Sequence, residues 1–159
     1  MAKVNQPLAL AWLHALWGMA LNAAWRNLSK ALDNGERNLL EQHGVEFNVM
    51  ATGFTWDTQD KEADTKAAQV VWKECQRMLA DPSIHLVLLD ELTYMVSYGY
   101  IELEEVVEAL NNRPREQSVV ITGRAAHRTL IEMADTVSEV KNVKHAFDSG
   151  LKARKGVDW

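Results

Sequence analysis

The amino-acid sequence predicts an α/β fold in which helices flank a parallel β-sheet. Ile84–Leu89 (IHLVLL) and Ser118–Thr122 (SVVIT) are compact apolar runs, typical of strands buried on both faces. A third candidate strand, Val45–Met50, alternates apolar and polar side chains. Helical patterns separate these three segments, and strands that alternate with helices form parallel sheets with right-handed crossovers.

Composition agrees with one soluble domain. The chain has 159 residues, 47% hydrophobic and 25% charged, which excludes disordered, collagen-like and disulfide-rich classes. The net charge of −5 argues against a nucleic-acid partner, because such proteins carry a basic surface for phosphate. Cys75 is the single cysteine, so no intrachain disulfide can form, and we expect a reducing, cytoplasmic location.

The charge is divided unevenly along the chain. All 22 acidic residues lie at or after Asp33, whereas residues 1–32 carry only three basic residues, for a net charge of +3. The remaining 14 basic and 22 acidic residues give residues 33–159 a net charge of −8. Three of the six tryptophans also precede Asp33, so the chain has two compositions.

Residues 8–32 contain few helix breakers and many Ala and Leu, so we expect a helix there. No charge occurs from Leu8 to Trp25, which resembles a signal peptide or a short membrane span. His14, Gly18 and Asn22 weaken both readings, and we expect no membrane partner.

The later helices follow from periodicity and from the residues that end them. Glu36–Gln42 predicts a short helix that stops at Gly44. Thr58–Ala80 predicts a long amphipathic helix that ends before Pro82, with a stripe of Ala63, Ala67, Val70, Val71, Cys75, Met78 and Leu79. We further expect helices at Glu102–Leu110 and His127–Ala134 and a last short strand at Thr136–Val140.

Polar or aromatic clusters follow three of the predicted strands directly. They are Gly53–Trp56 (GFTW), Asp90-Glu91 and Gly123-Arg124. Ligands of open α/β sheets bind at the carboxyl ends of the parallel strands, so all three clusters should lie at one edge of the sheet. The topology alone therefore predicts a site.

Asp90 and Glu91 form the acidic pair that follows an apolar strand in a Walker-B motif. Such carboxylates hold Mg²⁺, which neutralises nucleotide phosphates; the alternative is a pair of solvated loop acids. Arg124 is placed to bind a phosphate or carboxylate with its guanidinium fork, or else is an ordinary surface arginine. A phosphate-binding loop, G-x-x-x-x-G-K-[ST], does not occur in the sequence.

Phe54 and Trp56 are aromatic residues of a predicted loop. They either cover a small satellite core or form a wall for a large, flat ligand. His85 reads as a core histidine, and the sequence contains neither a zinc-ligand pattern nor a Ser-His-Asp pattern.

Several blocks of residues 33–159 resemble the ATP:corrinoid adenosyltransferases of the cobalamin pathway. The blocks are NGERNLLE at 34–41, VMATGFTW at 49–56, VLLDELTY at 87–94, ITGR at 121–124 and KHAFDSG at 144–150. The resemblance implies a P-loop-type α/β fold, a homodimer and a flavoprotein reductant. It also implies transfer of the 5′-deoxyadenosyl group from MgATP to the Co(I) of a reduced corrinoid. Asp90 and Glu91 match the metal-binding pair, Glu91 and Arg124 the nucleotide site, and Phe54 and Trp56 the corrinoid site.

The first 32 residues depart from this pattern, because family members begin with a strand and a GNGKGKTT phosphate loop. We therefore expect a domain over 33–159 that lacks the first strands and this loop. With suitable codons, reading Trp25–Leu32 two nucleotides later gives AQFIKGT, which resembles the family's second strand. Met1–Asn5 likewise gives GKGK, and Leu10–Ala20 gives a sequence like the helix that follows the loop. Residues 1–32 are thus explained either as an out-of-frame reading or as a genuine replacement segment.

Three functions follow as hypotheses from these residues. The first is a corrinoid adenosyltransferase whose activity is impaired because the phosphate loop is missing. The second is a nonenzymatic corrinoid-binding remnant, and the third is a P-loop ATPase with a different substrate.

Overall fold

The computed structural model describes residues 23–27, 35–49, 61–141, 143–144 and 146–152. Within these residues, four parallel strands form one sheet in the order β2-β1-β3-β4. The strands are β1 (Ala23–Asn27), β2 (Glu46–Val49), β3 (Leu86–Asp90) and β4 (Ser118–Ile121). The predicted parallel α/β sheet is confirmed.

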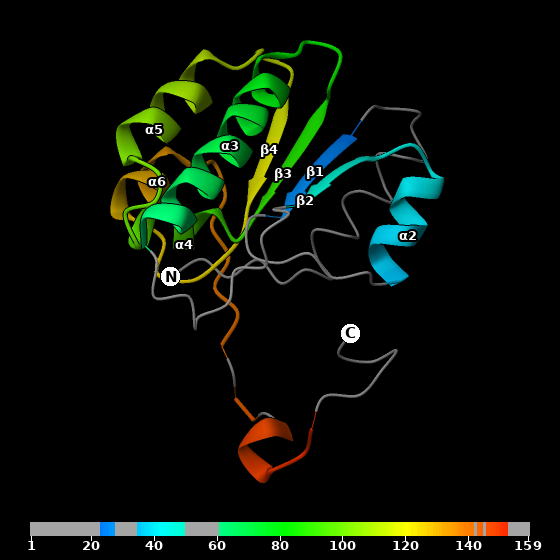
Figure 1. Cartoon of the computed structure of the whole chain (residues 1–159), viewed down its shortest axis with the longest axis vertical. Coiled ribbons are helices and arrows are strands. Elements are labelled where there is room, and N and C mark those ends of the chain that lie inside the picture. Colours follow the sequence, from blue (N-terminus) through cyan, green and yellow to red (C-terminus); the bar gives the residue numbers. More distant parts are fainter. Residues whose placement is uncertain (1–22, 28–34, 50–60, 142, 145, 153–159) are drawn as a thin grey trace.

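Helices α3 (Lys61–Ala80), α4 (Leu92–Ser97), α5 (Leu103–Asn112) and α6 (Arg128–Met133) gather on one side of the sheet, as Figure 1 shows. Helix α2 (Gly35–Gln42) lies on the other side, next to β2. A short 3₁₀ turn, η1 (Ala146–Ser149), lies away from the sheet. The described residues contain no helix long and apolar enough to cross a membrane.

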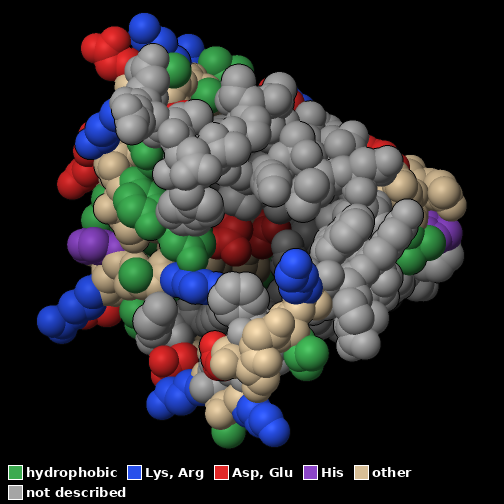
Figure 2. Space-filling view, turned by 60° about the horizontal axis from the view of Figure 1, so that its bottom comes forward, with side chains coloured by type: hydrophobic (Ala, Val, Ile, Leu, Met, Phe, Trp, Pro, Cys, Tyr) green, Lys and Arg blue, Asp and Glu red, His purple; other side chains and the backbone are tan. Residues whose placement is uncertain are grey.

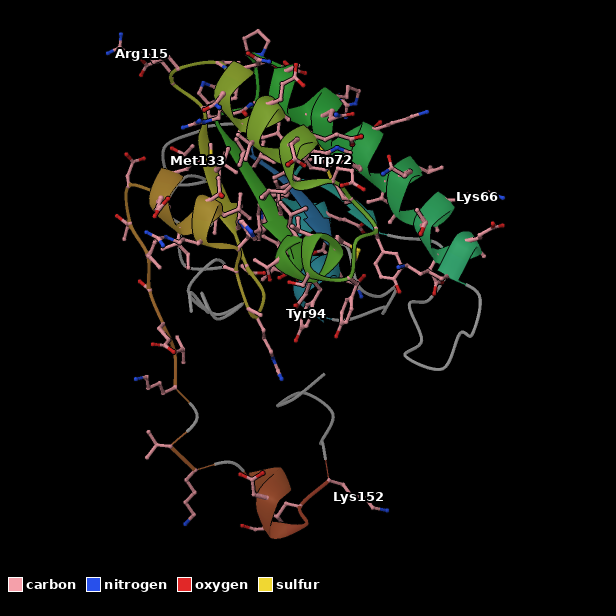
Figure 3. All side chains as sticks on the ribbon, turned by 90° about the vertical axis from the view of Figure 1, so that its left-hand side faces the viewer. Lys66, Trp72, Tyr94, Arg115, Met133 and Lys152 are labelled. Carbon is pink, nitrogen blue, oxygen red and sulfur yellow. The ribbon has the colours of Figure 1, made fainter. Side chains whose placement is uncertain are left out.

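The core lies between β3 and the helices α3 to α6. All five residues of β3 are buried, as the apolar run predicted. Trp72 and Cys75 of α3 are fully buried, and Figure 3 shows Trp72 on the inward side of its helix. Val70 was expected in the apolar stripe of α3, but 70% of its surface is exposed. Trp72 points into the core instead. An α-helix turns once every 3.6 residues, so positions 70 and 72 lie on different sides of the helix.

Strand β1 corrects the expectation of a helix throughout residues 8–32. Ala23–Asn27 is extended and pairs with β2 on one side and with β3 on the other. Its alanines favour a helix locally, but ladders on both sides satisfy the backbone hydrogen bonds of the strand, and tertiary context overrides propensity. The other residues of this segment lie outside the described part of the chain.

Two further expectations for the second half of the chain are wrong. Strand β4 was predicted to be buried on both faces, but it pairs only with β3 among the described strands and stays half-exposed. Residues 136–140, predicted as a strand, have no regular structure and are mostly exposed. Strand identity needs a pairing partner, which local sequence does not supply.

One buried side chain, just before β4, holds the segment that connects α3 to β3. The Gln117 side-chain nitrogen Nε2 lies 3.1, 3.1 and 3.0 Å from the carbonyl oxygens of Met78, Asp81 and Ile84, and its two N–H groups are shared among these three acceptors. These carbonyls belong to the last turn of α3 and to the segment that leads from it into β3. Gln117 therefore fixes the amino-terminal ends of β3 and β4 relative to each other.

Candidate functional site

The carboxyl edge, here Asp90, Glu91 and residues 122–125, lies where β3 and β4 end. Because the two strands run parallel and pair from Leu86↔Ser118 to Leu89↔Ile121, Asp90 and Thr122 emerge side by side. The Thr122 backbone N–H donates to the Leu89 carbonyl at 3.1 Å and extends the hydrogen-bond ladder one residue beyond β4. The predicted meeting of the Asp90-Glu91 and Gly123-Arg124 clusters is confirmed.

Asp90 is the most enclosed acidic group of this edge, with 1% of its surface exposed. Its carboxylate oxygen Oδ1 accepts a hydrogen bond from the Thr122 hydroxyl. A buried carboxylate is stabilised when such a donor replaces water, so this contact compensates part of the desolvation of Asp90. Figure 2 shows acidic side chains recessed in this face, with basic side chains beside them.

Glu91 adopts a left-handed backbone conformation, with φ 62° and ψ 17°. Residues with a Cβ rarely adopt this conformation, and it costs about 1–2 kcal/mol. The backbone N–H of Glu91 donates to Thr122 Oγ1 at 3.0 Å, which helps to hold the turn. The turn directs the chain from β3 straight into α4, whose first residue is Leu92.

The loop after β4 fits closely against the start of α4. The Thr93 hydroxyl donates to the Arg124 carbonyl at 2.8 Å. Ser97 Oγ lies 2.8 Å from the Thr93 carbonyl and 3.3 Å from the Ala125 carbonyl. A Cβ on Gly123, whose φ is 133°, would lie 2.0 Å from Thr93 Oγ1. Only glycine allows this close approach, and the Arg124 position depends on it.

Arg124 is exposed, and its positive charge acts on the neighbouring Tyr94 of α4. Burial raises the pKa of the Tyr94 phenol, whereas the Arg124 guanidinium partly opposes that shift. The Tyr94 ring stacks on that of Tyr98, with centroids 5.9 Å apart and planes 4° from parallel. Figure 3 shows Tyr94 at the end of the sheet opposite Arg115, so this aromatic pair borders the carboxyl edge.

The donor set suits a nucleotide-bound Mg²⁺ rather than a metal site made only by protein. The described residues contain no group of three or more His, Cys, Asp or Glu side chains that could hold a metal. Mg²⁺ commonly takes one or two carboxylates from the protein and completes its shell with water and substrate phosphates. Asp90 and Glu91 offer such a pair at a strand end, so they fit this ion.

Phe54 and Trp56, the expected corrinoid residues, lie outside the described residues. The placement of Cys75 in the apolar stripe of its helix is confirmed, because its side chain is fully buried. Sequence reasoning named Thr122 only as the end of a strand and gave no role to Thr93. One signal could have identified Thr122. It is a threonine at the end of a predicted strand, and the neighbouring predicted strand is followed by acidic residues.

Comparisons with known proteins agree with the geometry. The sequence model of the family described as ATP:corrinoid adenosyltransferase BtuR/CobO/CobP matches residues 9–159. The corrinoid adenosyltransferase of Escherichia coli (strain K12) is 67% identical over 126 residues, which cover 79% of this chain and 64% of that protein. The corrinoid adenosyltransferase CobA of Salmonella typhimurium is 64% identical over the same shares. The chain thus aligns with slightly less than two thirds of the length of these two relatives.

A more distant relative aligns with more of the chain. The corrinoid adenosyltransferase of Sinorhizobium sp. is 41% identical over 161 residues, which cover 99% of this chain and 75% of that protein. Both this alignment and the family match extend into residues 1–32, where we expected no family pattern. The family match covers nearly the whole chain, and this chain belongs to the ATP:corrinoid adenosyltransferase family.

Proposed function

We propose that this protein transfers the 5′-deoxyadenosyl group of ATP to the Co(I) of a reduced corrinoid. The observation that carries the proposal is the Asp90-Glu91 pair at the carboxyl edge, anchored by Thr122, in a chain of this family. In this reaction the Co(I) electron pair forms a bond to the 5′ carbon of ATP. The carbon–oxygen bond breaks, and its electrons leave with triphosphate.

In this proposal Asp90 and Glu91 hold Mg²⁺, which neutralises charge on the triphosphate leaving group. Arg124 and Glu91 belong to the nucleotide site, where the exposed guanidinium of Arg124 has access to a phosphate. Phe54 and Trp56 are proposed to contact the corrin and to exclude water from the cobalt, by resemblance to the family. The protein supplies position and charge neutralisation, and the corrinoid supplies the nucleophile.

Three further expectations belong to the same proposal. The active form is a homodimer in the cytoplasm, a flavoprotein supplies the electrons that reduce the corrinoid, and residues 1–32 are an out-of-frame reading of the phosphate-loop region. The family match from residue 9 onward is evidence against this third expectation. Without that loop, fewer backbone N–H groups and no loop lysine contact the triphosphate. We therefore expect weak ATP binding and low activity.

Two measurements test these expectations separately. The gene sequence upstream of Asp33 should encode a glycine-rich loop in the shifted frame, and stop codons in that frame would contradict the out-of-frame origin. Isothermal titration of the purified chain with MgATP should give weak binding, and micromolar affinity would show that residues 1–32 do not impair it.

The activity itself is tested with chemically reduced corrinoid and MgATP under anaerobic conditions. We expect the absorption spectrum to change slowly to that of the adenosylated corrinoid, with a matching release of triphosphate. Corrinoid binding without adenosylation would favour a nonenzymatic binding protein. Release of inorganic phosphate from ATP without corrinoid would favour an ATPase. Either result would contradict the proposed transfer.

A further inference from the structure

The hydroxyl of Thr122 contacts both positions of the acidic pair. It donates its proton to Asp90 Oδ1 and accepts the backbone N–H of Glu91 at 3.0 Å. Thr122 itself is 3% exposed, so water does not compete freely for either hydrogen bond. A single atom of the residue that follows β4 therefore links the side chain of one acid to the backbone of the next.

The two hydrogen bonds act on different properties of the pair. The bond to Asp90 fixes the rotation of its carboxylate, and thereby sets the direction in which the second oxygen points. The bond to the Glu91 N–H supports a left-handed turn that a non-glycine residue does not adopt readily. If both bonds are lost, each carboxylate can move away from the position that a shared cation requires.

We propose that Thr122 is a positioning residue that orients Asp90 and Glu91 for a nucleotide-bound divalent cation. This inference rests on the proposed function, because it assigns the acidic pair to the metal–ATP complex. Partners of this kind typically change metal affinity by about 10–100-fold when they are removed. Thr122 acts through the two acidic residues and needs no contact with the substrate.

Thr93 provides a matched control for a substitution at Thr122. It is also 3% exposed and lies at the start of α4, beside the carboxyl edge. Its hydroxyl, however, donates to the Arg124 carbonyl rather than to a carboxylate. Thr122→Val and Thr93→Val remove the same hydroxyl from equally buried sites. A difference in metal affinity between them therefore reports the contact with the acidic pair rather than a general loss of packing.

The experiment measures Mn²⁺ binding to the full-length chain in the presence of ATP, by electron paramagnetic resonance, beside thermal unfolding of each variant. We expect Thr122→Val to weaken Mn²⁺ binding by about 10–100-fold and Thr122→Ser to restore it to within about threefold. Thr93→Val should stay within about threefold of the unsubstituted protein. If Thr122→Val does not fold, the smaller Thr122→Ala replaces it with the same expected loss.

The outcomes separate this inference from the proposed function. If the unsubstituted protein fails to bind Mn²⁺ at an ATP concentration that saturates its ATP site in the titration above, the metal site is wrong and the role of Thr122 falls with it. If that protein binds Mn²⁺ and Thr122→Val binds it equally well, only the positioning role is overturned. Equal losses in Thr122→Val and Thr93→Val, in step with their unfolding temperatures, would also overturn it.

Discussion

The two ends of the β3–β4 pair are held together in different ways. At the amino-terminal end, the neutral amide of Gln117 contacts three backbone carbonyls at the end of α3 and in the segment that leads to β3. At the carboxyl end, the Thr122 hydroxyl contacts a buried carboxylate and the N–H of a residue in the left-handed conformation.

This difference separates a structural role from a functional one. Neutral contacts at the amino-terminal end satisfy backbone groups and add stability. The carboxyl edge instead collects a buried charge and strained backbone at Glu91 and Ala125, which cost free energy. Removing the polar side-chain contacts of the first end should change stability alone, whereas removing those of the second end should change ligand binding.

The largest expected effect comes from Asp90→Asn at the carboxyl edge. Loss of the negative charge should lower the adenosylation rate by about 10²–10³-fold, because the amide is a much weaker ligand for Mg²⁺. The free energy of unfolding should fall by no more than about 1 kcal/mol, since the substitution removes a buried charge. Asp135→Asn, at an exposed position, is the matched control for rate and for urea unfolding. A large loss of stability with Asp90→Asn would contradict the proposed division.

Gly123→Ala should give the largest loss of stability. The added Cβ would lie 2.0 Å from Thr93 Oγ1 and would impose a φ of 133° on alanine, so we expect about 2–4 kcal/mol in urea unfolding. Gly99→Ala is the control, because its φ is also positive, at 68°, but no atom lies within 4 Å of the added Cβ. It should cost only about 1–2 kcal/mol. Equal costs would show that the loop after β4 moves easily.

Gln117→Met tests the amino-terminal end. The substitution keeps the side-chain volume but removes the three donated contacts. The Met78 and Asp81 carbonyls still accept backbone N–H groups, so we expect a loss of only about 1–2 kcal/mol. Gln76→Met on α3, where the side chain is partly exposed, should change stability by less than about 0.5 kcal/mol. Mn²⁺ affinity should not change in either variant, and weaker binding by Gln117→Met would link the two ends.

The smallest effect is expected at the turn before β3. Hydrogen bonds from the Ser83 hydroxyl and the Ser83 backbone N–H hold the pKa of Asp81 below its ordinary value of 3.8, and the hydroxyl contributes most. The lowered pKa stabilises the fold above pH 3.8, and this contribution is lost as the pH falls through the lower folded value. Ser83→Ala should raise the Asp81 pKa only partway, because the backbone contact remains. Carbon-13 NMR titration measures it, and an unchanged pKa would contradict the assignment.

Much of this fold follows from local patterns. The long apolar stripe predicted α3, the run IHLVLL predicted β3, and Gly44 correctly marked the end of α2. Helix α4 was missed, because its six residues form fewer than two turns and show too little periodicity. The helix predicted where β1 lies was wrong for a different reason, since the ladders of β1 to β2 and β3 form only in the folded chain.

The candidate site divides in the same way. The sequence alone predicted that Asp90, Glu91 and Arg124 would meet at one edge, because strand direction determines where strand ends lie. It also identified the family, through blocks of residues that occur in a fixed order. The expected contribution of Phe54 and Trp56 to the same edge stays a prediction.

Only the tertiary structure showed how this edge is held. Residues 31 positions apart in the sequence form the contacts of Thr122 with Glu91 and of Thr93 with Arg124. A hydroxyl has no preferred partner until strand pairing and register bring one within about 3 Å. The sequence by itself therefore determined which charged groups gather at this edge. The register of β3 and β4 decided which hydroxyl orients them.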